Sequence, residues 1–156
     1  MTFSIILFII SWLCFFIFAD KKKLKGFLST CYLALILGLT TDLLIHHYPL
    51  WNYPSSSESH CINRHLADDF GVYFVTTYLF LQTLPKDETR LSIARHIFFW
   101  SILAISIEFI AIKTHAMKYG LWWNMRYSYI ADWILFLIFY IHHKFYNQLQ
   151  SNRSIN

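Results

Sequence analysis

The chain has 156 residues, of which 56% are hydrophobic, 20% are aromatic and only 14% carry a charge. Soluble domains carry about 25% charged residues, so this composition is typical of a membrane protein and not of a soluble or disordered chain. The length fits one domain, residues 1–156. The net charge of +4 does not indicate nucleic-acid binding, because the basic residues lie at the ends of apolar segments and form no stripe.

Five apolar runs predict an all-α bundle of five transmembrane helices, near residues 2–19, 27–48, 70–84, 96–113 and 129–146. The first run is followed by the basic cluster DKKKLKG, and a signal peptide has the opposite order, so we expect a retained helix. The run at 70–84 is short, and it crosses a bilayer only if flanking residues contribute or neighbouring helices shield it. A soluble bundle is disfavoured, because runs that are apolar on all faces have no side to present to water.

The basic residues predict the orientation. Of the 13 Lys and Arg residues, four fall on the side of the loops after the second and fourth runs, and nine on the opposite side. Because cytoplasmic loops are enriched in Lys and Arg, we expect the N-terminus outside and the C-terminus inside a cell membrane. The nine expected inside are Lys21, Lys22, Lys23, Lys25, Lys86, Arg90, Arg95, Lys144 and Arg153, and the four expected outside are Arg64, Lys113, Lys118 and Arg126.

Three acidic residues lie in the outer half of the expected membrane segments: Asp42, Glu108 and Asp132. A charged side chain in hydrocarbon costs a few kcal/mol, so such residues normally face the bundle interior and find partners. The sequence therefore predicts an outward-facing polar cluster.

Helical spacing adds neighbours to this cluster. Asp42 and His46 are i,i+4, and Glu108 and His115 are i,i+7, so each pair shares a helix face. Asp69 begins the third run from the same side, and the Trp-rich segment before the last run is expected to cap the cluster. The candidate residues are Asp42, His46, Asp69, Glu108, His115, Asp132, Trp122 and Trp123.

The cluster has three interpretations. Paired polar groups could hold the helices in register, as in a structural subunit of a membrane complex. The acids and the tryptophans could instead bind a small cation or a polar headgroup. Third, a membrane-embedded metal-dependent hydrolase or transferase could act on a lipid-like substrate, with Asp42, His46 and Glu108 as weak metal candidates; the chain has no HExxH motif. No cofactor is identified.

Contacts with other proteins are also open. The bilayer is the first expected partner, and a second membrane protein or another copy of the chain could be a further one. The polar residues of the short third run, Thr76, Thr77 and Gln82, would give its exposed contact face.

The segment SIEFIAIKTHAMKYGLWWNMRYSYIADW resembles the C-terminal hallmark of a family of small multipass membrane proteins from Bacillus- and Clostridium-type bacteria. The matching positions are Glu108, Lys113-Thr114, Lys118-Tyr119, Trp122 or Trp123, and Ser128. TDLLIHHYPLWNYP is similar to the family's second-helix acid and Tyr-Pro loop, and Asp69 resembles its third-helix acid. The resemblance implies four or five spans and no particular activity. The chain departs from the family in the loop SSSESHCINRH, where a more basic segment is expected, so Arg64 or a histidine would have to substitute.

Overall fold

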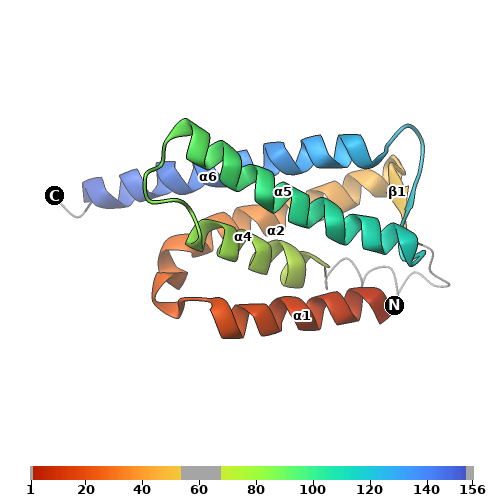
Figure 1. Ribbon diagram of the computed structural model, residues 1–156, viewed down its shortest axis with the longest axis horizontal. Coiled ribbons are helices and arrows are strands. Elements are labelled where there is room, and N and C mark those ends of the chain that lie inside the picture. Colours follow the sequence, from red (N-terminus) through yellow and green to blue (C-terminus); the bar gives the residue numbers. More distant parts are fainter. Residues whose placement is uncertain (1, 54–67, 154–156) are drawn as a thin grey trace.

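The computed structural model describes residues 2–53 and 68–153, and within them the fold is all-α (Figure 1). The five α-helices of this part of the chain lie where the five apolar runs predicted them. They are α1 (Thr2–Phe18), α2 (Leu24–His47), α4 (Phe74–Gln82), α5 (Arg90–Lys113) and α6 (Met125–Arg153). A 3-10 turn, η1 (Lys21–Lys23), precedes α2, and a π-helical turn, η2 (Asp68–Tyr73), precedes α4. The two-residue strands β1 (Trp51–Asn52) and β2 (Lys118–Tyr119) pair in antiparallel fashion.

Two helices extend beyond the apolar runs because polar residues cap them. Helix α5 begins at Arg90 and not near residue 96, since the Thr89 hydroxyl accepts a hydrogen bond from the Ser92 amide at 3.2 Å. Before α6, the Asn124 side chain accepts a hydrogen bond from the Arg126 amide at 3.0 Å. Apolar runs therefore mark the hydrophobic part of each helix and not its ends.

Within the described residues, two helical segments are long and apolar enough to cross a membrane: Lys21–His47 and Arg90–Lys113. Only 33% and 17% of their most apolar windows are buried, whereas the core helix of a soluble protein is mostly buried. Both segments instead turn large apolar side chains outward, such as Ile36 of α2 and Phe99 of α5. These features indicate membrane association. Five transmembrane helices are not confirmed, because α1 has 17 residues and α4 only nine.

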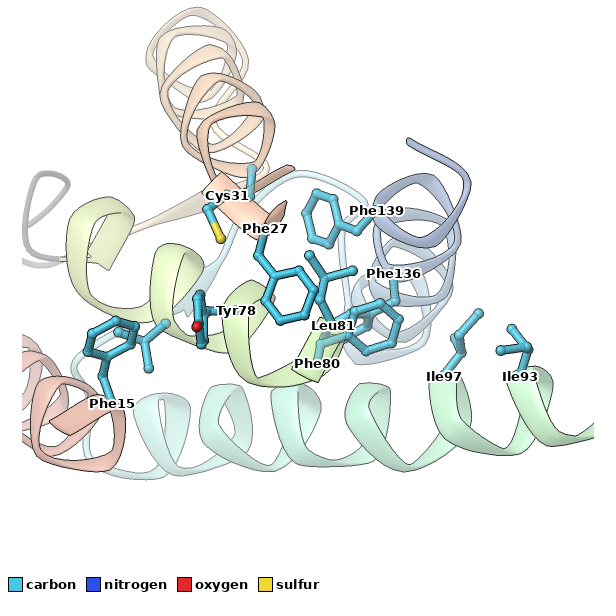
Figure 2. Close-up of a cluster of buried hydrophobic side chains, with 12 residues drawn as sticks. Phe15, Phe27, Cys31, Tyr78, Phe80, Leu81, Ile93, Ile97, Phe136 and Phe139 are labelled. Carbon is cyan, nitrogen blue, oxygen red and sulfur yellow. The ribbon is translucent and has the colours of Figure 1, made fainter. Parts of the chain in front are cut away.

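Short helix α4 lies at the centre of the bundle, packed against α1, α2 and α6 (Figure 1). Its Tyr78 and Phe80 are fully buried. Figure 2 shows aromatic and aliphatic side chains from the surrounding helices converging on these residues. Thr77 is only 1% exposed, and Gln82 is half-buried. The prediction that α4 presents an exposed contact face to another protein is therefore wrong, because the neighbouring helices already cover this helix.

Polar atoms of α4 bind the end of α1. The Gln82 side chain donates to the Phe18 carbonyl at 2.8 Å and accepts from the Asp20 amide at 2.6 Å. The Tyr78 hydroxyl donates to the Asp20 carbonyl at 2.6 Å. The last carbonyls of a helix have no partner within that helix, and in an apolar environment each needs one. Gln82 supplies such a partner for Phe18, the last residue of α1, and Tyr78 binds the Asp20 carbonyl in the turn that follows, so both side chains fix α4 against the turn from α1 to α2.

The turn between α1 and α2, the α4–α5 connection and the end of α6 lie at one end of the bundle (Figure 1). The N-terminus and the β1–β2 pair lie at the other end. We call these the basic end and the β-pair end, because the nine basic residues expected inside lie toward the first end. Of the four expected outside, Lys113, Lys118 and Arg126 lie toward the second, and Arg64 is outside the described residues. The structure thus keeps the charge asymmetry on which the orientation was predicted.

Replacing Gln82 by Ala should lower the free energy of unfolding by about 1 kcal/mol, because the Phe18 carbonyl and the Asp20 amide lose their partner. The measurement is thermal unfolding of the purified protein in a neutral detergent. Gln148→Ala is the matched control, since Gln148 is exposed on α6. Equal midpoints for the two variants would contradict the role assigned to Gln82.

Candidate functional site

A cavity of about 500 Å³ lies between the helices toward the β-pair end. It receives side chains from every helix and from both strand-bearing loops. Most of the lining is apolar, and the polar part consists of hydroxyl groups and two carboxylates. The described lining residues are Phe3, Ser4, Leu7, Thr41, Leu50, Trp51, Tyr53, Val72, Tyr73, Thr76, Thr77, Leu103, Ala104, Ile107, Glu108, Ala111, Ala116, Met117, Trp123, Ser128, Ala131, Asp132, Ile134, Leu135, Phe136 and Phe139.

The β1–β2 pair joins two loops that contribute to the lining of this cavity, one through Trp51 and the other through Met117. Trp51 pairs with Tyr119, and the Gly120 amide donates to the Leu50 carbonyl at 2.8 Å. A Cβ added at Gly120 would lie 2.4 Å from the Pro49 carbonyl oxygen. Only glycine permits this close approach of the two backbones, so Gly120 holds the loop after α2 against the loop before α6. Strands of two residues have no recognisable periodicity, and the sequence did not predict this pair.

Glu108 joins three elements at the cavity wall. Its carboxylate accepts hydrogen bonds from the Tyr119 hydroxyl and from the Ser128 hydroxyl, the latter at 2.6 Å. The Ser128 hydroxyl in turn accepts from the Trp123 indole at 2.8 Å. Burial raises the pKa of Tyr119, and the hydrogen bond to Glu108 raises it further. The phenol therefore stays protonated at neutral pH and remains a donor, so Glu108 connects α5 with α6 and with β2.

Asp132 lies in a different polar environment. It follows Ser128 by four residues on α6, so both side chains share one helix face. The Asp132 Oδ2 atom is buried and has no hydrogen-bond partner among the residues that the structure describes. Asp132 and Glu108 both line the cavity. The cavity wall thus combines one carboxylate that accepts from two hydroxyl groups with one carboxylate whose Oδ2 has no donor among the described residues.

The other acidic candidates lie elsewhere. Asp69 is only 1% exposed, and a Cβ added at Gly38 of α2 would lie 2.3 Å from its Oδ1 atom. It therefore packs at the contact between α2 and η2. Asp42 is half-buried near the end of α2; its neighbour Thr41 lines the cavity, and Asp42 is not among the described lining residues.

Among the remaining candidates, Trp123 lines the cavity, whereas Trp122 is 60% exposed. His46 and His115 are exposed, and His115 has a left-handed backbone with φ 57°. The structure thus brings Glu108, Asp132 and Trp123 together. The sequence did not identify Tyr119 and Ser128 as the partners of Glu108, although Ser128 has a signal, its i,i+4 spacing to Asp132.

In the part of the chain that the structure describes, no three His, Cys, Asp or Glu side chains come together in an arrangement that could hold a metal ion. Asp42, His46 and Glu108 are therefore not assembled as a set of ligands there.

Comparisons of the chain with protein-family models, with curated proteins and with solved structures found no match. The resemblance to a bacterial membrane-protein family stays a prediction, and the geometry of the cavity is the basis for a function.

Replacing Glu108 by Ala should lower the free energy of unfolding by about 1–2 kcal/mol, because the buried hydroxyl groups of Tyr119 and Ser128 lose their acceptor. Glu108→Gln keeps a carbonyl oxygen at the same place and should cost clearly less. Thermal unfolding of both variants in neutral detergent measures the difference. If Gln destabilises as much as Ala, charge and not hydrogen bonding explains the role of Glu108.

Gly120→Ala should separate the β1–β2 pair, because the new methyl group meets the Pro49 carbonyl. We expect faster tryptic cleavage after Lys118, which lies in β2. Gly26→Ala is the control, since a Cβ at Gly26 meets nothing within 4 Å. Cleavage at equal rates in both variants would show that the pair does not depend on Gly120.

Proposed function

We propose that the chain is a multipass membrane protein whose cavity binds the cationic group of a ligand at Asp132 and Glu108. One observation carries this proposal. The described lining residues include two carboxylates and no Lys, Arg or His. A cavity of this size with a single sign of charge favours a ligand group of the opposite sign.

The multipass part of the proposal rests on the surface and on the ends of the bundle. Large apolar side chains are exposed along α1, α2, α5 and α6, including Ile9, Ile36, Phe99 and Ile141. Contact of this large apolar surface with water is unfavourable, whereas the hydrocarbon of a bilayer would cover it. In this proposal α4 completes the bundle without contacting lipid on most of its surface, and the nine basic residues place the basic end inside.

The binding part rests on the contrast between the two carboxylates. In an apolar environment a carboxylate needs hydrogen bonds or an opposite charge. Glu108 accepts from Tyr119 and Ser128, so it stabilises the site also without a ligand. Asp132 Oδ2 lacks such donors among the described residues. A cation would supply the missing partner and would also reduce the repulsion between the two acids.

The proposed topology predicts opposite labelling of two engineered cysteines. In a variant without Cys14, Cys31 and Cys61, Lys118→Cys should react with a membrane-impermeant maleimide on intact cells, because β2 would lie outside. Lys86→Cys should react only after permeabilisation. If both positions are labelled from the same side, the chain does not cross the membrane an odd number of times between them. The proposed topology, with the N-terminus outside, would then be wrong.

Ammonium salts should stabilise the purified protein more than sodium salts of equal ionic strength. The measurement is the unfolding midpoint in neutral detergent across primary and quaternary ammonium and guanidinium salts, with sodium as the reference. At least one class should give a saturable increase, and Asp132→Asn should abolish it. The proposal fails if no salt differs from sodium or if Asp132→Asn responds like the wild type.

A further inference from the structure

We infer that the ligand is an amphiphilic amine, in which one ammonium group is attached to an apolar body of organic-ligand size. This inference rests on the proposed cation-binding function and names its ligand class. The size and the lining of the cavity support it, as does the small number of oxygen atoms available at Asp132.

The cavity is too large for a bare cation. Its volume of about 500 Å³ lies within the range of roughly 300–1,000 Å³ that is usual for organic ligands. One water molecule occupies about 30 Å³ in the liquid, so a hydrated inorganic ion would leave most of this space empty. An organic body is needed to fill it.

The charged groups lie on one part of the cavity wall. Glu108 and Asp132 lie on α5 and α6, whereas the described lining of α1, α2 and α4 carries no charged side chain. A ligand with its charge at one end matches this division. Contact of its apolar body with the apolar side chains of this lining contributes about 25 cal/mol for each Å² removed from water.

The protein atoms that could bind a cation also favour an ammonium group over a metal ion. Ca²⁺ takes 6–8 oxygen ligands, and Mg²⁺ requires near-octahedral geometry. Among the described residues, no three His, Cys, Asp or Glu side chains come together in a group that could hold such an ion. An ammonium group has three donors, and it can use Asp132 Oδ2 together with one or two further acceptors. The indoles of Trp51 and Trp123, which line the cavity, offer aromatic faces at which a cation is also stabilised.

The test compares three matched probes: 4-phenylbutylamine, 4-phenylbutan-1-ol and 4-phenylbutyrate. Methylammonium is the fourth probe and has the charge without the body. The full chain is placed in phosphatidylcholine nanodiscs, with empty nanodiscs as the reference for partitioning. Binding is followed by tryptophan fluorescence, because Trp51 and Trp123 line the cavity.

We expect saturable binding of 4-phenylbutylamine, with the alcohol, the carboxylate and methylammonium each at least about tenfold weaker. Asp132→Asn should weaken amine binding by a similar factor. Asp87→Asn is the matched control and should bind as the wild type does, since Asp87 is exposed at the basic end.

Two results would overturn the inference in different ways. If methylammonium binds as tightly as 4-phenylbutylamine and depends on Asp132, the amphiphilic ligand is wrong but the cation site stands. If the alcohol binds as tightly as the amine and Asp132→Asn changes nothing, the cavity is only an apolar site and the proposed function fails as well.

The same amine chemistry could come from a lipid of the bilayer or from a free hydrophobic amine. Mass spectrometry of lipids retained by the purified protein separates these sources. An amine-bearing lipid that is retained by the wild type and lost from Asp132→Asn identifies the bilayer as the source. Binding of 4-phenylbutylamine without such a lipid identifies a free amine.

Discussion

The hydrogen bonds accepted by Glu108 are the interaction on which the β-pair end of this protein depends. Tyr119 brings β2 to the carboxylate, and Ser128 brings α6. Because β1 is paired with β2, the loop after α2 is held in place as well. One half-buried acid thus holds these elements together at the cavity wall, and it does so without a ligand. The same requirement for partners acts at the basic end, where Gln82 of α4 satisfies the end of α1.

The role of α4 follows from its length. Nine residues rise about 14 Å, roughly half the hydrocarbon thickness of a bilayer. Such a helix is stable in an apolar environment only if its neighbours cover it and its polar atoms find partners. Tyr78 and Phe80 meet the first condition and Gln82 meets the second. The sequence indicated that the third run crosses a bilayer only if flanking residues contribute or neighbouring helices shield it. It could not indicate that Thr77 faces inward, because the sequence does not specify which neighbouring helix covers each side of α4.

Much of the fold and part of the site were predictable. Apolar runs located all five helices, and the similar depths expected for Glu108 and Asp132 agree with their place in one cavity lining. The β1–β2 pair was not predictable, since its position depends on two loops far apart in sequence. Helical spacing placed Asp42 and His46 on one face, but it could not specify what that face meets. His46 is exposed, and Asp42 lies outside the described lining of the cavity.

The central claim is that Asp132 is present to bind a ligand, whereas Glu108 holds the fold together even without one. The most direct test is the thermal stability of Asp132→Leu without ligand, in neutral detergent. A carboxylate kept for binding destabilises the empty protein, so an apolar side chain of similar size should raise the free energy of unfolding by about 1 kcal/mol or more. Destabilisation by a similar amount would contradict the claim, because Asp132 would then hold the helices together as Glu108 does.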